Sequence, residues 1–562
     1  MGFFSRLRGR SKSSSRTAKV YDLHLQKNDH GSNGSKYVPP VPQLSRPRRD
    51  LTQDLPLPVL RRILAAVCPH TQDDSYDTSE ESMTEDGCML CDMRDLAHSA
   101  LVSRRWAVEA RALLYAHVRI DPVHYCELEE ELAAKRKRRS FFDRNGDPID
   151  APQVRLSLLM RTVRQDRDLG DRVLSLRMPY MTREANKAGI ARTVSVLPNL
   201  RYVDLPTGIF HDDPSCLALK QELMVRCPDL RRMSYRHGAE GSIAQLPGTH
   251  LWPNLEILEL TGLQIEASVL RFALASFPRL RILTLDDLPL LDDSALMPVQ
   301  ALPPFPAVQR LTLRDVPNVT ANGMAGLFSS SSNRKSLLHL TLQSTSVSPA
   351  ALHRLLDALP RLQSLSIVQS VSRSFPVDQV RPLASRSLLS LHFEITPASS
   401  ASFGMLPVSA SYYSYLVSSL TSNTLPALQE LYVRDSTFPE NLLLAPPPRL
   451  FGGGESGPQT PAGLGGVLAH PLNVYSKGID ELEWNFTPYE PPATRGRRDN
   501  TTRPVSFHDA HLSRTWGGDS RRSVLVGNGF GGFLAVPVDE GRPTSSFGTG
   551  KRERDSRSDL WR

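Results

Sequence analysis

Four residues of the types that bind zinc lie close together near the start of the chain. Cys68 and His70 form a C-x-H pair, and Cys88 and Cys91 form a C-x-x-C pair seventeen residues further on. Zinc favours thiolate and imidazole ligands in a tetrahedral arrangement, so this set could hold a structural zinc ion that closes a long loop. Free thiols, or a redox function for the C-x-x-C pair, are the alternatives that the spacing leaves open. No cofactor is required by either alternative.

The loop between these pairs is acidic. It contains seven acidic residues and no lysine or arginine: Asp73, Asp74, Asp77, Glu80, Glu81, Glu85 and Asp86. Five of its hydroxyl residues are candidates for phosphorylation: Ser75, Thr78, Ser79, Ser82 and Thr84. A solvated acidic loop and a phosphorylated regulatory loop are both consistent with this composition.

Catalytic motifs are missing from the sequence. His508, Asp509 and His511 lie near one another, but no nucleophile elbow, paired-carboxylate motif or phosphate loop accompanies them. The glycines at 527, 529 and 532 are not followed by the amphipathic helix that a nucleotide-binding loop needs. We therefore expect a protein that is not an enzyme.

Charge and composition restrict the partners. The formal net charge of +8 lies in residues 1–50, which hold eleven lysines and arginines against three aspartates, and a segment of this kind is expected to be disordered. The rest of the chain is neutral as a whole, so we expect no nucleic-acid partner. No apolar run approaches the ~18 residues of a membrane helix, so we expect no membrane span.

Two observations concern the compartment. Six cysteines in 562 residues fit a reducing compartment, which predicts a cytoplasmic or nuclear protein. One basic run is a candidate nuclear import signal, or alternatively the basic end of a connecting helix: Lys135, Arg136, Lys137, Arg138 and Arg139.

Two segments before these basic residues carry apolar side chains at helical spacing. In residues 57–67 they recur at three- and four-residue intervals, and Leu55 with Pro56 marks the turn before them. The same spacing returns in residues 96–115. About 40 residues of such material rarely fold stably alone, so we expect other protein surface to cover them.

These segments resemble an F-box motif at its signature positions: Leu55, Pro56, Leu60, Ile63, Leu64, Leu101, Val102, Trp106, Leu113 and Leu114. The resemblance implies that these residues bind a Skp-type adaptor, which joins F-box proteins to a cullin and a RING subunit in an SCF ubiquitin ligase. The chain departs from the family in its long insert, residues 69–93, where a short loop is usual. An ordinary helical hairpin packed on the rest of the chain is the competing interpretation.

A second pattern repeats between residues 173 and 484. Each copy has an apolar anchor followed by apolar residues three and five positions later, as in PNLEILEL and PRLRILTL. The anchors are Val173, Leu200, Leu230, Leu255, Leu280, Val308, Leu337, Leu362, Leu388, Leu428 and Ile479. Most steps lie near the 20–29 residues typical of a leucine-rich repeat. Helical spacing between anchors, as after Ser348 and Pro349, predicts a strand, a turn and a helix in each unit.

The chain as a whole therefore resembles F-box proteins with leucine-rich repeats. The resemblance implies an α/β fold in which an F-box helical module precedes a leucine-rich-repeat solenoid with its strands on the concave side. The turn positions that often carry Asn or Cys hold Leu263, Leu288, Val316 and Thr345, so we expect an irregular solenoid. A non-solenoid α/β domain is the competing interpretation.

The expected organisation has six parts. They are a disordered basic tail at 1–50, the F-box with its insert (69–93) at 51–120, connecting helices at 121–165, the solenoid at 166–490 with a Pro/Gly-rich insert at 442–466, a C-terminal cap or extension at 491–540 and a disordered tail at 541–562.

A docking module followed by an extended strand surface is the layout of a substrate receptor. We expect the substrate-recognition subunit of an SCF-type ubiquitin ligase, whose repeats bind an unknown target protein. A repeat scaffold that acts without the ligase is the alternative. The expected outward residues of the strands carry both charge signs and do not predict an arginine cluster for phosphate: Glu256, Glu259, Arg279, Arg281, Gln309, Arg310, Arg361, Gln363 and Gln429.

Overall fold

The computed structural model describes residues 55–67, 71, 75–81, 94–120, 151–376, 380–398, 408–443, 468, 470–491 and 523–524. The chain divides into two units after Leu55, and every helix and strand below belongs to the second unit. The expected tails at 1–50 and 541–562, and residues 444–466 of the expected Pro/Gly-rich insert, lie outside the described residues.

Three helices form the module at the start of the second unit. They are α1 (Leu57–Ala65), α2 (Arg94–Ser99) and α3 (Arg104–Ala116). The Ser103 side chain caps α3 by accepting a hydrogen bond of 3.2 Å from the Trp106 amide. Helix α3 contacts both other helices, and the three share a small buried core: Leu60, Leu64, Leu96, Ala110 and Leu113.

A short strand joins this module to a sheet. Strand β1 (His117–Arg119) follows α3 directly and pairs in parallel with β2 (Ser175–Arg177), which pairs with β3 (Tyr202–Val203). The Leu174 amide also donates to the carbonyl of Ala116, the last residue of α3, at 2.8 Å. The last residues of the expected F-box segment are therefore the edge strand of this sheet.

A second sheet of eleven strands continues the first one. Its strands are β4 (Arg232–Arg236), β5 (Ile257–Thr261), β6 (Ile282–Asp286), β7 (Arg310–Arg314), β8 (His339–Gln343), β9 (Ser364–Val371), β10 (Ser390–Pro397), β11 (Glu430–Val433), β12 (Leu472–Ser476), β13 (Trp484–Tyr489) and β14 (Ser523–Val524). They lie in chain order and are parallel from β4 to β12, whereas β13 and β14 are antiparallel additions. The Arg231 amide, just before β4, donates to the Arg201 carbonyl, just before β3, at 2.8 Å.

The apolar template locates the strands. Each of the first ten anchors is buried and lies two residues before a strand, which confirms these units. The eleventh is wrong, because Ile479 is half exposed and the next parallel strand is β12. In the register with β11, Ser476 of β12 is paired with Val433. The apolar template does not detect this strand, because a buried serine stands where the template requires an apolar residue.

The turns after four successive strands are alike. The residue directly after the strand has a positive φ in each of them: Gly262 (67°), Asp287 (50°), Asp315 (48°) and Ser344 (49°). The next residue is the expected turn position and is buried in all four units. These four positions thus share a left-handed backbone conformation, which glycine and short polar residues tolerate. The irregularity of the repeats stays a prediction.

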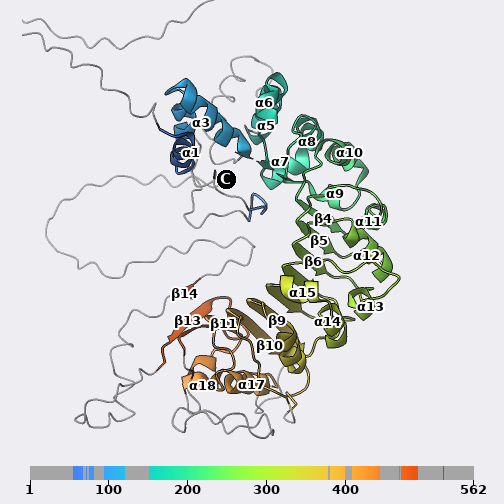
Figure 1. Cartoon of the computed structure of the whole chain (residues 1–562), viewed down its shortest axis with the longest axis vertical. Helices are drawn as coiled ribbons and strands as arrows, with labels where there is room; N and C mark the ends of the chain where they lie inside the picture. The colour runs from blue at the N-terminus through green and yellow to red at the C-terminus, as the bar shows by residue number, and fades with distance from the viewer. Residues whose placement is uncertain are drawn as a thin grey trace, which may run out of the picture. The chain divides into compact units, whose positions relative to one another are not determined.

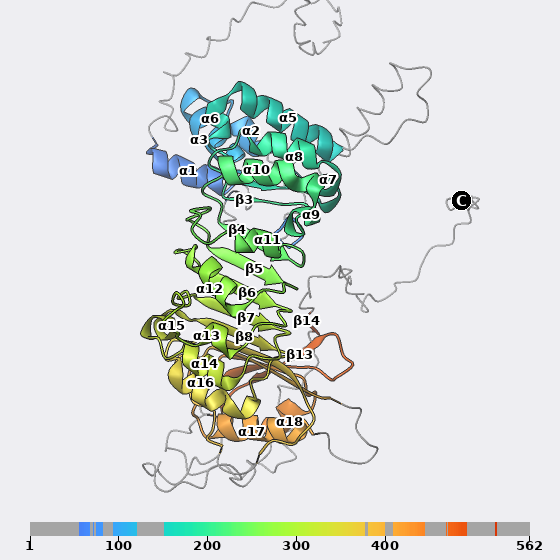
Figure 2. The same ribbon diagram turned by 90° about the vertical axis from the view of Figure 1, so that its right-hand side faces the viewer.

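Helices cover one face of the sheet, as Figures 1 and 2 show. They are α5 (Ala151–Gln165), α6 (Arg167–Gly170), α7 (Tyr180–Ala185), α8 (Lys187–Val194), α9 (Thr207–Phe210), α10 (Leu217–Arg226), α11 (Glu240–Ala244), α12 (Ala267–Ala275), α13 (Asp293–Leu296), α14 (Ala321–Leu327), α15 (Ser331–Ser336), α16 (Leu352–Ala358), α17 (Ala410–Thr421) and α18 (Phe438–Leu443), with 3₁₀ turns at Pro214–Cys216 and Pro349–Ala351. Ser348 caps the second 3₁₀ turn, and Pro349 lies in its first position, as expected. Alternate strand residues point into the core below these helices, so the opposite strand face is polar.

Helix α5 agrees with the connecting helix expected up to residue 165, and residues 121–150 lie outside the described part. None of the described helices combines the length and apolar character needed to cross a bilayer. The architecture is thus a mixed α/β fold with a large, mainly parallel sheet.

Candidate functional site

The residues expected to bind an adaptor separate into a core group and a surface group. Leu60, Leu64 and Leu113 are buried in the three-helix core, where they stabilise the module and have no access to a partner. Leu101 and Val102, by contrast, are 83% and 60% exposed in the turn between α2 and α3. Ile63 and Pro56 are also exposed, whereas Leu55, Trp106 and Leu114 are intermediate.

Further apolar residues extend this surface group. Leu57, Val59 and Val67 on or next to α1, and Val108 on α3, each expose more than two fifths of their surface. Several exposed apolar residues on one small module are typical of an interaction surface. We call Leu101, Val102, Ile63 and Val59 the apolar patch.

The candidate zinc ligands Cys68, His70, Cys88 and Cys91 lie outside the described residues, and so does the basic run at 135–139. Among the residues that the structure does describe, no group of three or more His, Cys, Asp or Glu side chains is arranged to hold a metal ion. The zinc site and the nuclear import signal stay predictions.

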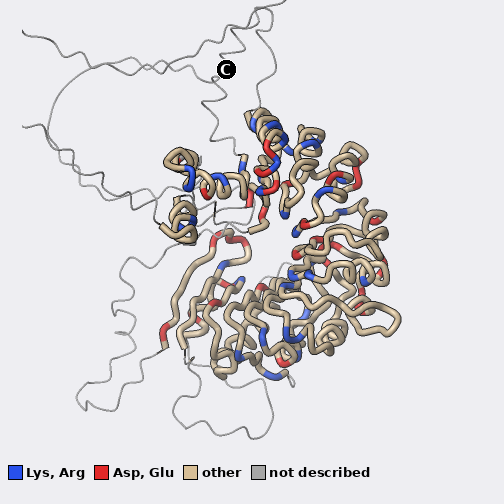
Figure 3. The backbone as a smooth tube through the Cα atoms, turned by 45° about the horizontal axis from the view of Figure 1, so that its top comes forward, with Lys and Arg blue, Asp and Glu red and all other residues tan. Residues whose placement is uncertain are grey.

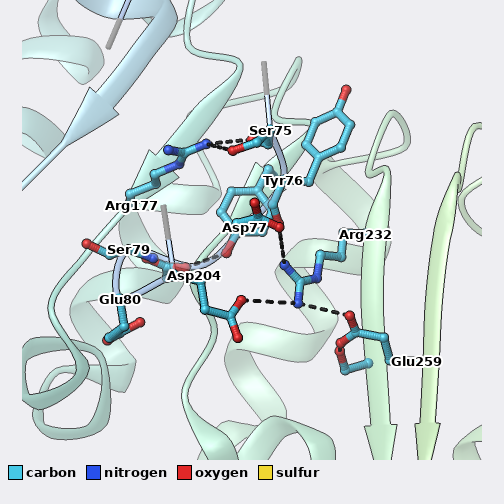
Figure 4. A network of polar contacts seen from close by, with 12 residues as sticks. Ser75, Tyr76, Asp77, Ser79, Glu80, Arg177, Asp204, Arg232 and Glu259 are labelled. Carbon is cyan, nitrogen blue, oxygen red and sulfur yellow. Dashed lines mark hydrogen bonds and ion pairs between the residues drawn. The ribbon is translucent and has the colours of Figure 1, made fainter. Parts of the chain in front are cut away.

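Part of the acidic insert lies on the sheet. Residues 75–81, which we call the strap, contact side chains from β1, β2, β4 and α7. Figure 4 shows the contacts of Arg177 and Arg232 with the strap. The strap precedes these strands by up to 156 positions in the chain. Nothing in the local sequence predicts that the strap lies close to these strands.

Arginine side chains bind the backbone of the strap. Arg177 donates to the Ser75 carbonyl, Arg232 to the Tyr76 carbonyl, and Arg119 to the Ser79 carbonyl at 3.5 Å. Guanidinium groups carry several donors in a fixed plane, so each can hold a carbonyl and a further acceptor at once. We call Arg119, Arg177, Arg183 and Arg232 the arginine cradle.

Acidic side chains of the strap add ion pairs. Glu80 forms an ion pair of 3.0 Å with Arg183, whose side chain is only 12% exposed. Asp77 and Glu81 each lie 3.9 Å from Arg232, and both are more than half exposed. The Glu80 pair is therefore the stronger one, because exposed pairs at longer distance contribute little.

Asp204 supports the strap from below. Its buried carboxylate accepts hydrogen bonds from the Met178 amide at 2.8 Å, from the Tyr202 hydroxyl and from the Ser79 amide at 3.3 Å. Burial raises the pKa of Asp204, and these hydrogen bonds only partly oppose that effect. Burial, followed by the nearby Asp204 charge, raises the pKa of Tyr202 as well.

Tyr76 is the one aromatic residue of the strap. Its ring lies 6.3 Å from the Tyr202 ring, and Arg177 lies 5.9 Å from the centre of the same Tyr202 ring. Burial is the main reason why the pKa of Tyr76 is raised. An aromatic residue followed by acidic ones thus matches the surface beneath it.

The arginine cradle is not among the surface features predicted from the sequence, and the absence of a phosphate pocket among the outward residues named there stays a prediction. The outward residues considered from sequence begin at Glu256, whereas the cradle lies on earlier strands and on α7. Both charge signs do occur along the sheet, as expected (Figure 3). Arg231, next to the cradle, is already paired with Glu256 at 2.6 Å and lies 3.7 Å from Asp229.

A different surface occupies the other end of the sheet. Tyr432 stacks on His392 at 3.8 Å and on Tyr475 at 4.4 Å, and Trp484 meets Tyr432 edge-on at 5.4 Å. These rings come from β10, β11, β12 and β13 and form a row across the polar strand face. Sequence analysis missed the row because it depends on the register of β12.

An ionic cluster lies beside the aromatic row. Glu394 is 3.6 Å from Lys477, 3.8 Å from His392 and 3.9 Å from Arg434. Burial would raise the pKa of Glu394, but the nearby His392 ring and the positive charges of Lys477 and Arg434 outweigh it, so the pKa is lowered. The strand face thus has an arginine-rich end and an aromatic end.

Comparisons with known proteins give little information about the family or fold of the chain. No family model matches the chain. No curated protein matches it either. Among solved structures, the chain is similar to one described as the crystal structure of the Rad7 and Elc1 complex in yeast, with a TM-score of 0.31 and 13% identity over 61% of this chain and 91% of that chain. This similarity is too weak to support a statement about function.

Proposed function

We propose that the chain is the substrate-recognition subunit of an SCF-type ubiquitin ligase and is not itself an enzyme. In this proposal the three-helix module is an F-box that binds a Skp-type adaptor, and the repeated strand–turn–helix units form a leucine-rich-repeat solenoid. The polar strand face binds the target protein, and the cullin and RING subunits supply the chemistry. The protein acts in the cytoplasm, the nucleus or both.

The observation that carries the proposal is the exposure of Leu101 and Val102. These two residues occupy F-box signature positions in the sequence, and they are 83% and 60% exposed in the structure. Burying these apolar side chains in a partner would contribute a favourable free energy of roughly 25 cal/mol per Å² of apolar surface, before the costs of association are subtracted. The buried indole N–H of Trp106, which has no acceptor among the described residues, lies on the same module.

The connection between module and sheet supports the same proposal. Strand β1 follows α3 without a linker and pairs with β2, so the adaptor-binding module would be fixed to the target-binding sheet. A receptor needs such a rigid link, because the ligase must hold its target at a defined position. A flexible scaffold has no such need.

The direct test mixes the purified full-length chain with a purified Skp-type adaptor and analyses the mixture by size-exclusion chromatography with light scattering. We expect a complex with one copy of each protein. If the two proteins elute separately although the chain is folded, the ligase proposal is wrong and the scaffold interpretation takes its place.

A further inference from the structure

We propose that the arginine cradle is a binding site for an acidic peptide of the target protein, and that the strap occupies this site in the absence of the target. The identity of the bound peptide as part of a ligase target rests on the proposed function. The site itself rests on the contacts of the strap.

The contacts of the strap are those of a bound peptide. Three of its backbone carbonyls, at Ser75, Tyr76 and Ser79, accept hydrogen bonds from cradle arginines. The strap has no regular structure at residues 75–77 and forms a turn at 78–81, where the Glu81 amide donates to the Thr78 carbonyl at 3.1 Å. Contacts with backbone carbonyls do not depend on side-chain identity, so a segment of another protein with the same backbone path can form them.

The side chains of the strap define the preferred sequence. Tyr76 contacts Tyr202, Asp77 and Glu81 lie near Arg232, and Glu80 is paired with Arg183. The preferred target segment therefore has an aromatic residue, an acidic residue directly after it, and two acidic residues at the fourth and fifth positions after the aromatic one. Carboxylates are the natural partners of guanidinium groups.

Two of the four cradle arginines, Arg183 and Arg232, keep partners outside the strap when the strap leaves. Arg232 forms an ion pair of 2.9 Å with Glu259, and Arg183 lies 3.9 Å from Asp204 and donates to the Met178 carbonyl at 3.5 Å. Leaving a buried charge without a partner is costly, but these contacts come from the sheet and not from the strap. Displacement of the strap thus leaves Arg183 and Arg232 paired.

Competition by the strap lowers the apparent affinity for a target. A site that is free only a fraction of the time binds its ligand more weakly by that fraction, and a covalently attached competitor acts at a high effective concentration. Only a target segment with matching aromatic and acidic residues would displace the strap. The insert between the first two F-box helices would in this way select targets.

The experiment uses full-length protein and a fluorescein-labelled peptide with the sequence of residues 75–81. Three forms are compared by fluorescence anisotropy: the native chain, a strap variant with Tyr76→Ser, Asp77→Ser, Glu80→Ser and Glu81→Ser, and the same strap variant with Arg183→Gln and Arg232→Gln added. A second peptide, with its acidic residues replaced by their amides, is the probe control.

We expect the strap variant to bind the acidic peptide at least ~10-fold more tightly than the native chain does. The added arginine substitutions and the amide peptide should each abolish this gain. Equal binding by the native chain and the strap variant would overturn the proposal. A strap variant that melts at a much lower temperature and gains no binding would also overturn it, because the strap would then be a structural brace.

Adaptor binding is measured on the same samples. If the adaptor binds and the strap variant gains no peptide binding, only the present inference fails. If peptide binding is gained and no adaptor binds, the cradle is a peptide site of a protein outside the ligase.

Discussion

Arg232, the first residue of β4, donates a hydrogen bond to the backbone carbonyl of Tyr76, which precedes it by 156 positions. The same guanidinium group is paired with Glu259 of β5 at 2.9 Å. One side chain thus joins the insert of the helical module to two strands of the large sheet. Burial alone would lower the pKa of Arg232, but Glu259 and its other neighbours outweigh burial and raise it, so this arginine stays charged.

Replacing this arginine should release the strap. A hydrogen bond from a charged donor contributes about 1.5–3 kcal/mol, so Arg232→Gln should increase the open population of the strap roughly tenfold or more. We expect glutamyl endopeptidase to cleave the variant faster after Glu80 and Glu81, as followed by mass spectrometry.

The matched control is Arg310→Gln. Arg310 occupies the same register position three strands further along the sheet, where it is exposed. The Arg310→Gln substitution should leave the rate of cleavage after Glu80 and Glu81 unchanged. Equal cleavage of the native chain and the Arg232 variant would mean that this hydrogen bond does not hold the strap.

Helix α1 should show two different responses to leucine substitution. Leu60 is fully buried, and Leu57 on the same helix is 48% exposed. Leu60→Ala should lower the free energy of unfolding of the module by about 2–5 kcal/mol, whereas Leu57→Ala should change it by less than about 0.5 kcal/mol. Urea unfolding followed by circular dichroism measures both, and similar effects of the two variants would contradict the described core.

The aromatic row should stabilise the last parallel strands. Tyr432 stacks on both His392 and Tyr475, and each aromatic stack contributes about 0.5–1.5 kcal/mol. Tyr432→Ala should therefore lower the free energy of unfolding by about 1–3 kcal/mol. Tyr432→Phe keeps the ring and should retain most of this stabilisation. If both variants are equally destabilised, the hydroxyl group rather than the ring stacking is responsible.

Glu394 should give the protein a specific response to acid. Its pKa is lowered from the ordinary value of 4.5, so the unfolded state takes up its proton first as the pH falls. The stabilisation from Glu394 is fully present above pH 4.5 and disappears as the pH falls through the lowered pKa. Glu394→Gln should therefore lose stability mainly above pH 4.5, and its difference from the native chain should shrink below it.

Urea unfolding on both sides of pH 4.5 measures this difference. The control is Glu490→Gln, since Glu490 is exposed at the end of β13. The control should follow the native chain at every pH. A difference between Glu394→Gln and the native chain that does not vary with pH would contradict the lowered pKa.

The sequence predicts the strands well because their spacing is local. A buried anchor two residues before each strand is set by the unit length, so ten of the eleven anchors locate strands. The pattern fails at β12, where Ser476 takes a core position. It also fails to distinguish the buried Leu60 from the exposed Leu101, because helical spacing marks apolar residues whether they face a core or a partner.

The site could be predicted only in part. The acidic insert and the apolar positions that resemble an F-box are visible in the sequence, but the pairing of Glu80 with Arg183 joins residues 103 positions apart. Such a contact depends on how the insert folds back onto the sheet. The row of rings on β10 to β13 depends in the same way on strand register, which no local pattern provides.

The central claim is that the apolar patch binds a Skp-type adaptor. Isothermal titration calorimetry of the full-length chain tests it with three proteins: the native chain, the Leu101→Asp, Val102→Asp double variant and Val225→Asp, an equally exposed valine on α10. We predict that the native chain and Val225→Asp bind the adaptor with the same affinity and that the double variant binds at least ~100-fold more weakly, since central interface residues each contribute about 2 kcal/mol or more. Absence of binding by the folded native chain, or equal binding by all three proteins, would contradict the claim.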